Sequence, residues 1–234
     1  MLTQENANSI ITYIEQCKGV VIMARIRKIR RRLVEGLNYF LIDANFLVNK
    51  YIPSTVAPND TQKRRIEKCC EWWDEIDSQL NSGRARVYIC DLCIAEAFKV
   101  LAKKYYVEKW FSNSTTYSNS KKRLIHEITT TAKELSKFNR RIRYHDISTC
   151  RDIIISVNRF FEVFLKNKLD VSLPDLIILA TAKYLIDFYD IPANRMHIIT
   201  LDKDLRRGAK YIQELPYTYD PTDPADARDK VFIG

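Results

Sequence analysis

The stretch YFLIDANFLVNKY, residues 39–51, decides the fold. Its first part, Tyr39 to Asp43, is a short apolar run that ends in a carboxylate, as expected for a buried strand of a parallel sheet. Its second part, Asn45 to Tyr51, predicts a helical turn that Pro53 stops. A second apolar run, HIITLD from His197 to Asp202, also ends in an acid. If the two strands pair in parallel, their ends bring Asp43 and Asp202 together at the edge of the sheet where such folds place active sites.

Outward from these two strands, helices and strands alternate along the chain. The alternation predicts an α/β fold with a mostly parallel central sheet, covered by helices on both faces. Asp91 is expected to cap the helix that it precedes, and the Ser-, Asn- and Thr-rich residues 112–120 are expected to form a loop. Further strands are predicted over 87–90 and 142–147, and further helices over 61–80, 91–105, 121–138, 151–167, 174–187 and 205–213.

Composition limits the class of protein. Hydrophobic residues make up 46% of the 234, which is enough for a sizeable core, and no apolar run is long enough to cross a membrane. Lys and Arg number 38 against 29 Asp and Glu, a net charge of +9, which favours nucleic acid as a partner or serves only as a solvated basic surface. The six cysteines form no disulfide framework, and reduced thiols indicate a cytoplasmic protein. The pair Cys90 and Cys93 fits either a redox role or two small buried side chains.

Both ends of the chain are predicted to lie outside the core. Residues 1–36 form a basic helical extension in which Ile22, Ile26, Ile29 and Leu33 make one apolar stripe among arginines. Such a helix fits RNA, an anionic membrane or a protein partner, or it packs on its own domain. Residues 215–234, rich in Pro and Asp, are predicted to be a poorly ordered tail.

Four carboxylates are candidates for one shared site. Asp43 and Asp202 end strands, Glu96 lies a turn and a half into its helix, and Asp175 begins an apolar helix. Each also has a simpler interpretation. Asp43 caps the following turn, Asp175 forms a capping box with Ser172, Glu96 is solvated, and Asp202 is a turn residue.

A cluster of four carboxylates needs a cation. Without one, like charges raise one another's pKa and destabilise the fold. Mg²⁺ or Mn²⁺ prefers oxygen ligands, relieves this repulsion, and can activate water for attack on a phosphodiester. Chemistry of this kind needs no His and no nucleophilic Ser or Cys.

The chain resembles the PIN-domain ribonucleases, among them toxins of VapBC-type pairs, in four places between residues 38 and 213. FLIDANFLV is similar to the family's first strand and its Asp-x-Asn-x-Leu/Val signature. YICDLCIAEAFKVL is similar to the second segment, LPDLIILATAKYL to the third and IITLDKDL to the fourth. The residues that carry these matches are Asp43, Asn45, Leu47, Glu96, Asp175, Thr200, Asp202 and, as an additional acid, Asp204.

The resemblance implies a three-layer α/β/α sandwich over residues 37–214 and a divalent-metal-dependent endoribonuclease. Asp43, Glu96, Asp175 and Asp202 would be catalytic and, together with Asp204, would ligate Mg²⁺ or Mn²⁺. Asn45 and Thr200 would support these acids by hydrogen bonds. The resemblance also implies the toxin of a toxin–antitoxin pair, with RNA as substrate, a small antitoxin as partner and a homodimer.

The chain is longer than those toxins because of its extension and a helical insertion at about residues 107–167. Basic residues of the insertion are candidates to bind RNA, namely Lys121, Lys122, Arg123, Arg140 and Arg141. Aromatic side chains nearby are available to stack bases but are expected to belong to the core, namely Tyr105, Tyr106, Trp110 and Phe111.

Other enzyme classes fit the sequence less well. A HAD-type phosphotransferase also begins with a strand ending in Asp, but it needs a second Asp where Asn45 stands. The chain has no Gly-rich phosphate loop and no nucleophile elbow, and its three histidines are too few for a His-based site. Two alternatives stay open. One is a non-catalytic PIN-like RNA-binding or assembly module, and the other is DNA as the substrate.

Overall fold

Five strands form one sheet in the order β3-β2-β1-β4-β5, and every pairing in it is parallel. The central strands β1 and β4 are buried along their whole length, because each is mostly apolar and is covered on both faces. The predicted α/β class with a parallel sheet is confirmed. The strands are β1 (Asn38–Ile42), β2 (Ala85–Cys90), β3 (Tyr144–Ile147), β4 (Met196–Ile199) and β5 (Thr218–Tyr219).

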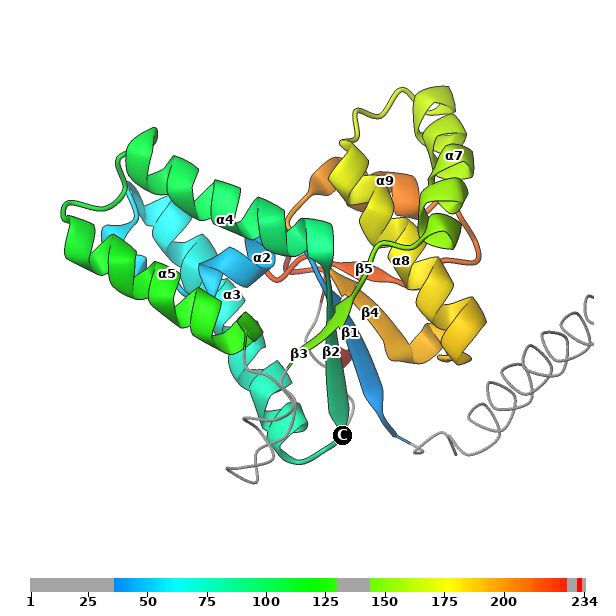
Figure 1. Cartoon of the computed structure of the whole chain (residues 1–234), viewed down its shortest axis with the longest axis horizontal. Helices are drawn as coiled ribbons and strands as arrows, with labels where there is room; N and C mark the ends of the chain where they lie inside the picture. Colours follow the sequence, from blue (N-terminus) through cyan, green and yellow to red (C-terminus); the bar gives the residue numbers. More distant parts are fainter. Residues whose placement is uncertain (1–35, 130–143, 227–230, 233–234) are drawn as a thin grey trace, which may run out of the picture. The chain divides into compact units, whose positions relative to one another are not determined.

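Helices lie on both sides of this sheet (Figure 1). The helices α7, α8 and α9 gather on one side, and α2, α3 and α5 on the other. The bounds are α2 (Ala44–Asn49), α3 (Asp60–Asn81), α4 (Asp91–Tyr106), α5 (Ser114–Thr129), α7 (Arg151–Lys166), α8 (Leu173–Tyr189) and α9 (Lys203–Ala209), with short 3-10 turns η1 (Ser54–Val56) and η2 (Ala193–Arg195).

This computed structural model describes residues 36–129, 144–226 and 231–232. They belong to a compact unit that begins at Gly36. Several predictions fall outside the described residues. These are the basic extension up to residue 35, the end of the helix predicted over 121–138, the first two residues of the strand predicted over 142–147, and the candidate RNA-binding residues Arg140 and Arg141.

Two predictions about where helices begin were wrong. The loop predicted over 112–120 gives way to α5 at Ser114, because the Asn113 side chain accepts hydrogen bonds from the backbone N and Oγ1 of Thr116 (2.8 and 2.9 Å). The Ser, Asn and Thr residues there are helix-start signals rather than loop signals. Asp91 is the first residue of α4, and Cys90 occupies the N-cap position in its place.

The segment after residue 214 also differs from its prediction as a poorly ordered tail. Thr218–Tyr219 forms β5, which pairs with β4 at the edge of the sheet. Beyond it, Arg206 of α9 forms ion pairs with Asp220, Asp223 and Asp226 (3.3, 3.2 and 3.1 Å). Polar contacts of this arginine hold the segment against α9, and hydropathy alone does not reveal them.

Candidate active site

Asp43 lies directly after β1 with only 1% of its surface exposed. Its backbone N donates to the Ile199 carbonyl of β4 (3.0 Å), so the end of one strand is fastened to the end of its neighbour. Asp43 stands at the N-cap position of α2, but its side chain makes no capping hydrogen bond. Burial, followed by the charge of Asp175, raises the pKa of Asp43 to about 7. Capping therefore does not explain why a carboxylate is buried here.

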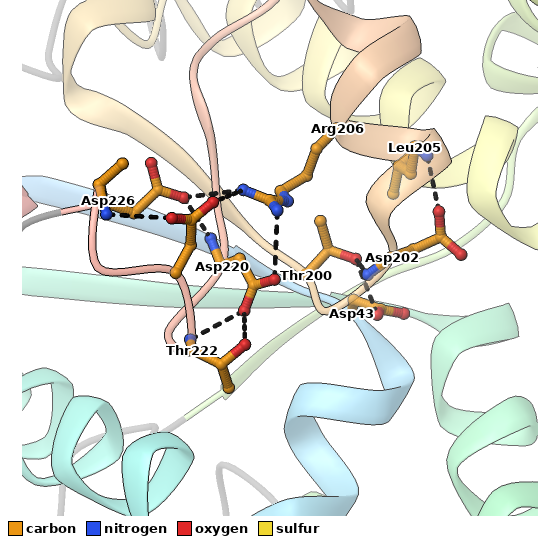
Figure 2. A network of polar contacts seen from close by, with 10 residues as sticks. Asp43, Thr200, Asp202, Leu205, Arg206, Asp220, Thr222 and Asp226 are labelled. Carbon is orange, nitrogen blue, oxygen red and sulfur yellow. Dashed lines mark hydrogen bonds and ion pairs between the residues drawn. The ribbon is translucent and has the colours of Figure 1, made fainter. Parts of the chain in front are cut away.

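Thr200 follows β4 and is fully buried beside Asp43. Its Oγ1 donates to Oδ2 of Asp43 (3.0 Å) and accepts from the backbone N of Asp202 (2.9 Å), as Figure 2 shows. One hydroxyl thus links two of the candidate acids, and its bond lowers the pKa of Asp43 in opposition to burial. Asn45, the other predicted supporting residue, lies half-buried in the first turn of α2.

Glu96 lies in the second turn of α4 and is half-buried. Its Oε2 is buried and has no hydrogen-bond donor within the described part of the chain. Burial and then the charge of Asp175 raise the pKa of Glu96, and Lys99 opposes the shift. The interpretation of Glu96 as an ordinary solvated residue is therefore wrong.

Asp175 lies in the first turn of α8 and forms the capping box that the sequence allowed. The hydroxyl and backbone N of Ser172 both donate to Oδ2 of Asp175 (2.5 and 3.2 Å). Burial is the largest cause that raises the pKa of Asp175, the Ser172 hydroxyl lowers it, and the charge of Asp202 raises it. Asp175 is thus both a capping residue and electrostatically coupled to the other candidate acids.

Asp202 lies beyond β4, which ends at Ile199 and not at residue 202 as predicted. Its Oδ1 accepts from the backbone N of Leu205 (2.6 Å), so that Asp202 caps α9 (Figure 2). Asp204, the additional acid, lies two residues further on in the first turn of α9, where its Oδ1 accepts from Nη1 of Arg207 (3.2 Å).

The four acids form one electrostatically connected group. Asp175 raises the pKa of both Asp43 and Glu96, and Asp202 raises the pKa of both Glu96 and Asp175. Among the described residues, however, no three Asp, Glu, His or Cys side chains are arranged so that they could hold a metal ion as they stand. The oxygen donors and the unpartnered Glu96 oxygen fit a hard cation, but the ligand set is not preassembled.

The residues singled out beside the acids fall into three groups, which are basic, aromatic and cysteine side chains. Lys121, Lys122 and Arg123 are exposed on α5, as an RNA contact requires. Trp110 and Phe111 are buried, as expected of core aromatics, whereas Tyr106 is 62% exposed. The thiols of Cys90 and Cys93 are free, buried and 2.9 Å apart.

Sequence reasoning missed the arginine that lies beside this site. Arg206 is one turn into α9 from Asp202, and it engages Asp220 and two further aspartates of the C-terminal segment (Figure 2). The regular spacing of Asp220, Asp223 and Asp226 was the available signal.

Comparison with known proteins gives distant structural matches. No family model matches the chain, and no curated protein does. None of the described helices is both long and apolar enough to span a membrane. The similar solved structures include VapBC2 from Rickettsia felis bound to a DNA fragment from its promoter, at 9% identity and a TM-score of 0.45, covering 78% of this chain and 98% of that one.

Two further structures match to the same extent. FitAcB from Neisseria gonorrhoeae has 16% identity and a TM-score of 0.44, covering 78% of this chain and 97% of that one. VapBC-1 from nontypeable Haemophilus influenzae has 14% identity and a TM-score of 0.44, with coverage of 79% and 99%. Sequence identities this low do not carry residue roles from those proteins to this chain.

Proposed function

We propose that this chain is a divalent-metal-dependent endoribonuclease whose catalytic carboxylates are Asp43, Glu96, Asp175 and Asp202. The observation that supports this proposal is the raised pKa of Asp43, Glu96 and Asp175 at the carboxyl edge of a parallel sheet, caused first by burial and then by the charge of neighbouring acids. A cation relieves that repulsion and gives the buried Oε2 of Glu96 the partner that it lacks.

All four acids would ligate Mg²⁺ or Mn²⁺, and neighbouring groups would orient three of them. Thr200 orients Asp43, Ser172 orients Asp175, and the first turn of α9 orients Asp202. Glu96 would turn its free oxygen toward the ion, with Asn45 and Asp204 at the margin of the site. When bound, the ion neutralises charge on the phosphodiester and lowers the pKa of a bound water, which is the chemistry that hydrolysis requires.

The raised pKa of Asp43, about 7, makes proton release part of the proposal. A ligating carboxylate must be deprotonated, so metal binding near neutral pH should release protons into solution. Calorimetric titrations in buffers of different ionisation enthalpy would measure this release.

The alternative is a non-catalytic module that binds RNA or supports assembly. One observation favours it, namely that the described acids are not arranged to hold an ion as they stand. The finer assignments, to the toxin of a toxin–antitoxin pair with an antitoxin partner and a homodimer, rest on the family resemblance and are also proposals.

The deciding experiment compares thermal unfolding of wild type, Asp43→Asn and Asp74→Asn, in EDTA and in millimolar Mg²⁺ or Mn²⁺. Cleavage of mixed RNA and of single-stranded DNA is measured in parallel. Asp74 is an exposed residue of α3 and controls for the loss of one negative charge.

Metal should raise the unfolding midpoint of wild type and of Asp74→Asn, because a ligand of the native state stabilises it. Asp43→Asn should be more stable than wild type in EDTA, respond less to metal and cleave nothing. If metal does not change the unfolding midpoint of wild type and no RNA is cut, the enzyme proposal fails. The non-catalytic binding module is then the better proposal. Cleavage of DNA alone would change the substrate class and leave the carboxylate chemistry in place.

A further inference from the structure

Helix α4 leads away from the carboxylates to the hairpin that it forms with α5 (Figure 1). Residues three, seven and ten positions after Glu96 share its side of the helix, since these spacings return to the same face. They are Lys99, Lys103 and Tyr106. The buried residues of α4, Cys93, Ala97 and Leu101, lie on the inner side of the helix, which packs into the core. The outer face therefore runs about 15 Å from a candidate catalytic acid to an exposed tyrosine, at about 1.5 Å per residue.

The two lysines extend positive charge outward from the acids. Lys99 is exposed, and its charge lowers the pKa of Glu96, so it acts on the carboxylate group itself. The Lys103 side chain is 60% exposed and forms a long ion pair with Glu108 (3.6 Å). Exposed pairs of this kind contribute little to stability, so a phosphate can replace Glu108 at small cost.

The ring of Tyr106 is supported by two other aromatic rings. Tyr105 and Tyr117 stack at 4.3 Å with an interplanar angle of 7°, and this pair joins α4 to α5. The ring of Tyr106 lies edge-on to both, at 4.7 and 5.8 Å, and 62% of the residue is exposed. A ring that is supported by two neighbouring rings and is open to solvent is an arrangement on which an unpaired base can stack. Trp110 differs, because it is buried under the Lys104 ammonium, 3.3 Å from its ring centre.

We propose that this outer face of α4 binds single-stranded RNA, with Lys99 and Lys103 on its phosphates and Tyr106 stacked on a base. Lys99 and Lys103 form a single row of positive charges, which can contact the phosphates of one RNA strand. A stacking tyrosine also needs an unpaired base, so an RNA duplex fits this face poorly. The inference rests on the proposed nuclease function for the identity of the polymer. It adds a binding site outside the carboxylates that would set how the strand enters them.

The test uses the full chain and a fluorescein-labelled single-stranded RNA oligonucleotide, with binding followed by anisotropy in EDTA across a range of salt concentrations. Lys99→Gln/Lys103→Gln should weaken binding and flatten the slope of log affinity against log salt by about 1.4, at about 0.7 for each lost phosphate contact. The matched control is Arg84→Gln/Arg86→Gln, which removes two exposed charges at the amino end of β2, and its slope should change by far less.

The stacking role of Tyr106 is tested by removing its ring in one variant and keeping the ring without its hydroxyl in another. Tyr106→Ala should weaken binding by about tenfold, the size expected for the loss of one stacked base, whereas Tyr106→Phe should bind as wild type does. Equal unfolding midpoints for all variants would show that the fold is retained. A duplex of the same sequence should bind more weakly and should not respond to Tyr106→Ala.

The outcomes separate this inference from the proposed function. RNA binding that depends on the α4 face, without cleavage in Mg²⁺ or Mn²⁺, would support the inference and reject the nuclease. Cleavage by wild type with an unchanged salt slope in the lysine pair, or unchanged affinity in Tyr106→Ala, would reject the inference and keep the nuclease. Failure of wild type to bind the oligonucleotide, or equal losses in the arginine control, would also overturn the inference.

Discussion

At the scale of single residues, two buried groups make stability depend on pH in opposite directions. Asp43 has its pKa raised from 3.8 to about 7, chiefly by burial, so its neutral form is favoured in the folded state. His197 of β4 has its pKa lowered from 6.5 to about 4, also by burial. The position of Asp43 was predictable because an acid after an apolar strand is visible in sequence. The effect of His197 was not, since only the packed structure shows Phe40 and Tyr219 around its ring (5.4 and 5.6 Å).

The first prediction concerns Asp43→Asn. In wild type without metal, the stability that the neutral carboxyl provides is complete below pH 3.8 and is lost as pH rises through about 7. The loss is at most about 1.4 kcal/mol per pH unit. Asp43→Asn should abolish this loss, and saturating Mg²⁺ should reduce it in wild type. Urea unfolding across this range measures the slope, and an unchanged slope in Asp43→Asn would show that Asp43 does not titrate with folding.

The second prediction concerns His197→Leu. Neither ring nitrogen of His197 has a hydrogen-bond partner in the described part of the chain. Protonation therefore disfavours the fold, and stability that is present above pH 6.5 is lost as pH falls through about 4. His197→Leu should retain more stability than wild type in acid, by up to about 1.4 kcal/mol per pH unit, with a small change at neutral pH. The control is His126→Leu, a substitution at an exposed position of α5, and an equal gain of acid stability in both variants would contradict the prediction.

At the scale of elements, the sequence predicted four of the five described strands and the long helices α3, α4, α7 and α8, because patterns of apolar residues define them. Helix α3 was predicted over 61–80 and spans Asp60–Asn81. Prediction from sequence failed where polar side chains decide where a helix begins. Asn113, for example, starts α5 inside a segment that was expected to be a loop. The half-burial of Glu96 was also beyond the helical wheel, since neighbouring elements and not the helix itself cover its carboxylate.

A close approach between α7 and α9 yields the third prediction. A Cβ placed on Gly208 of α9 would overlap the ring of Phe164, a fully buried residue of α7. Gly208→Ala should therefore destabilise the fold by about 1–3 kcal/mol, the usual cost of overpacking. Urea unfolding of Gly208→Ala, Phe164→Leu and the double variant checks the cause. The double variant should be more stable than the sum of the single effects predicts, and strict additivity would mean that the two groups do not collide.

At the scale of the whole described unit, the C-terminal segment marks the limit of sequence reasoning. Its Pro and Asp content predicted disorder, because low hydrophobicity usually leaves too little burial to order a chain. The segment is ordered at Thr218–Tyr219 by pairing with β4, and beyond it by charge. Arg206 lies 14, 17 and 20 residues before the three aspartates that it binds, and apolar periodicity does not link it to them. The same limit applies to the site. The type and position of its acids were predictable from the sequence, but their electrostatic coupling depends on distances that only the folded structure gives.

The last prediction tests whether Arg206 holds this segment on the sheet. Its side chain is largely buried among Asp220, Asp223 and Asp226, so Arg206→Gln leaves three acids without their shared counter-charge. The expected loss of stability is about 2–3 kcal/mol, below the range for fully buried pairs because the acids are partly exposed. Chymotrypsin should also cut faster at Tyr219, which wild type protects by burial in β5. Arg207→Gln, at an exposed neighbour paired with Asp204, should change stability by less than about 0.5 kcal/mol and leave cleavage unaltered. Equal effects of the two arginine variants would mean that the cluster does not anchor the segment, and that strand pairing with β4 alone does.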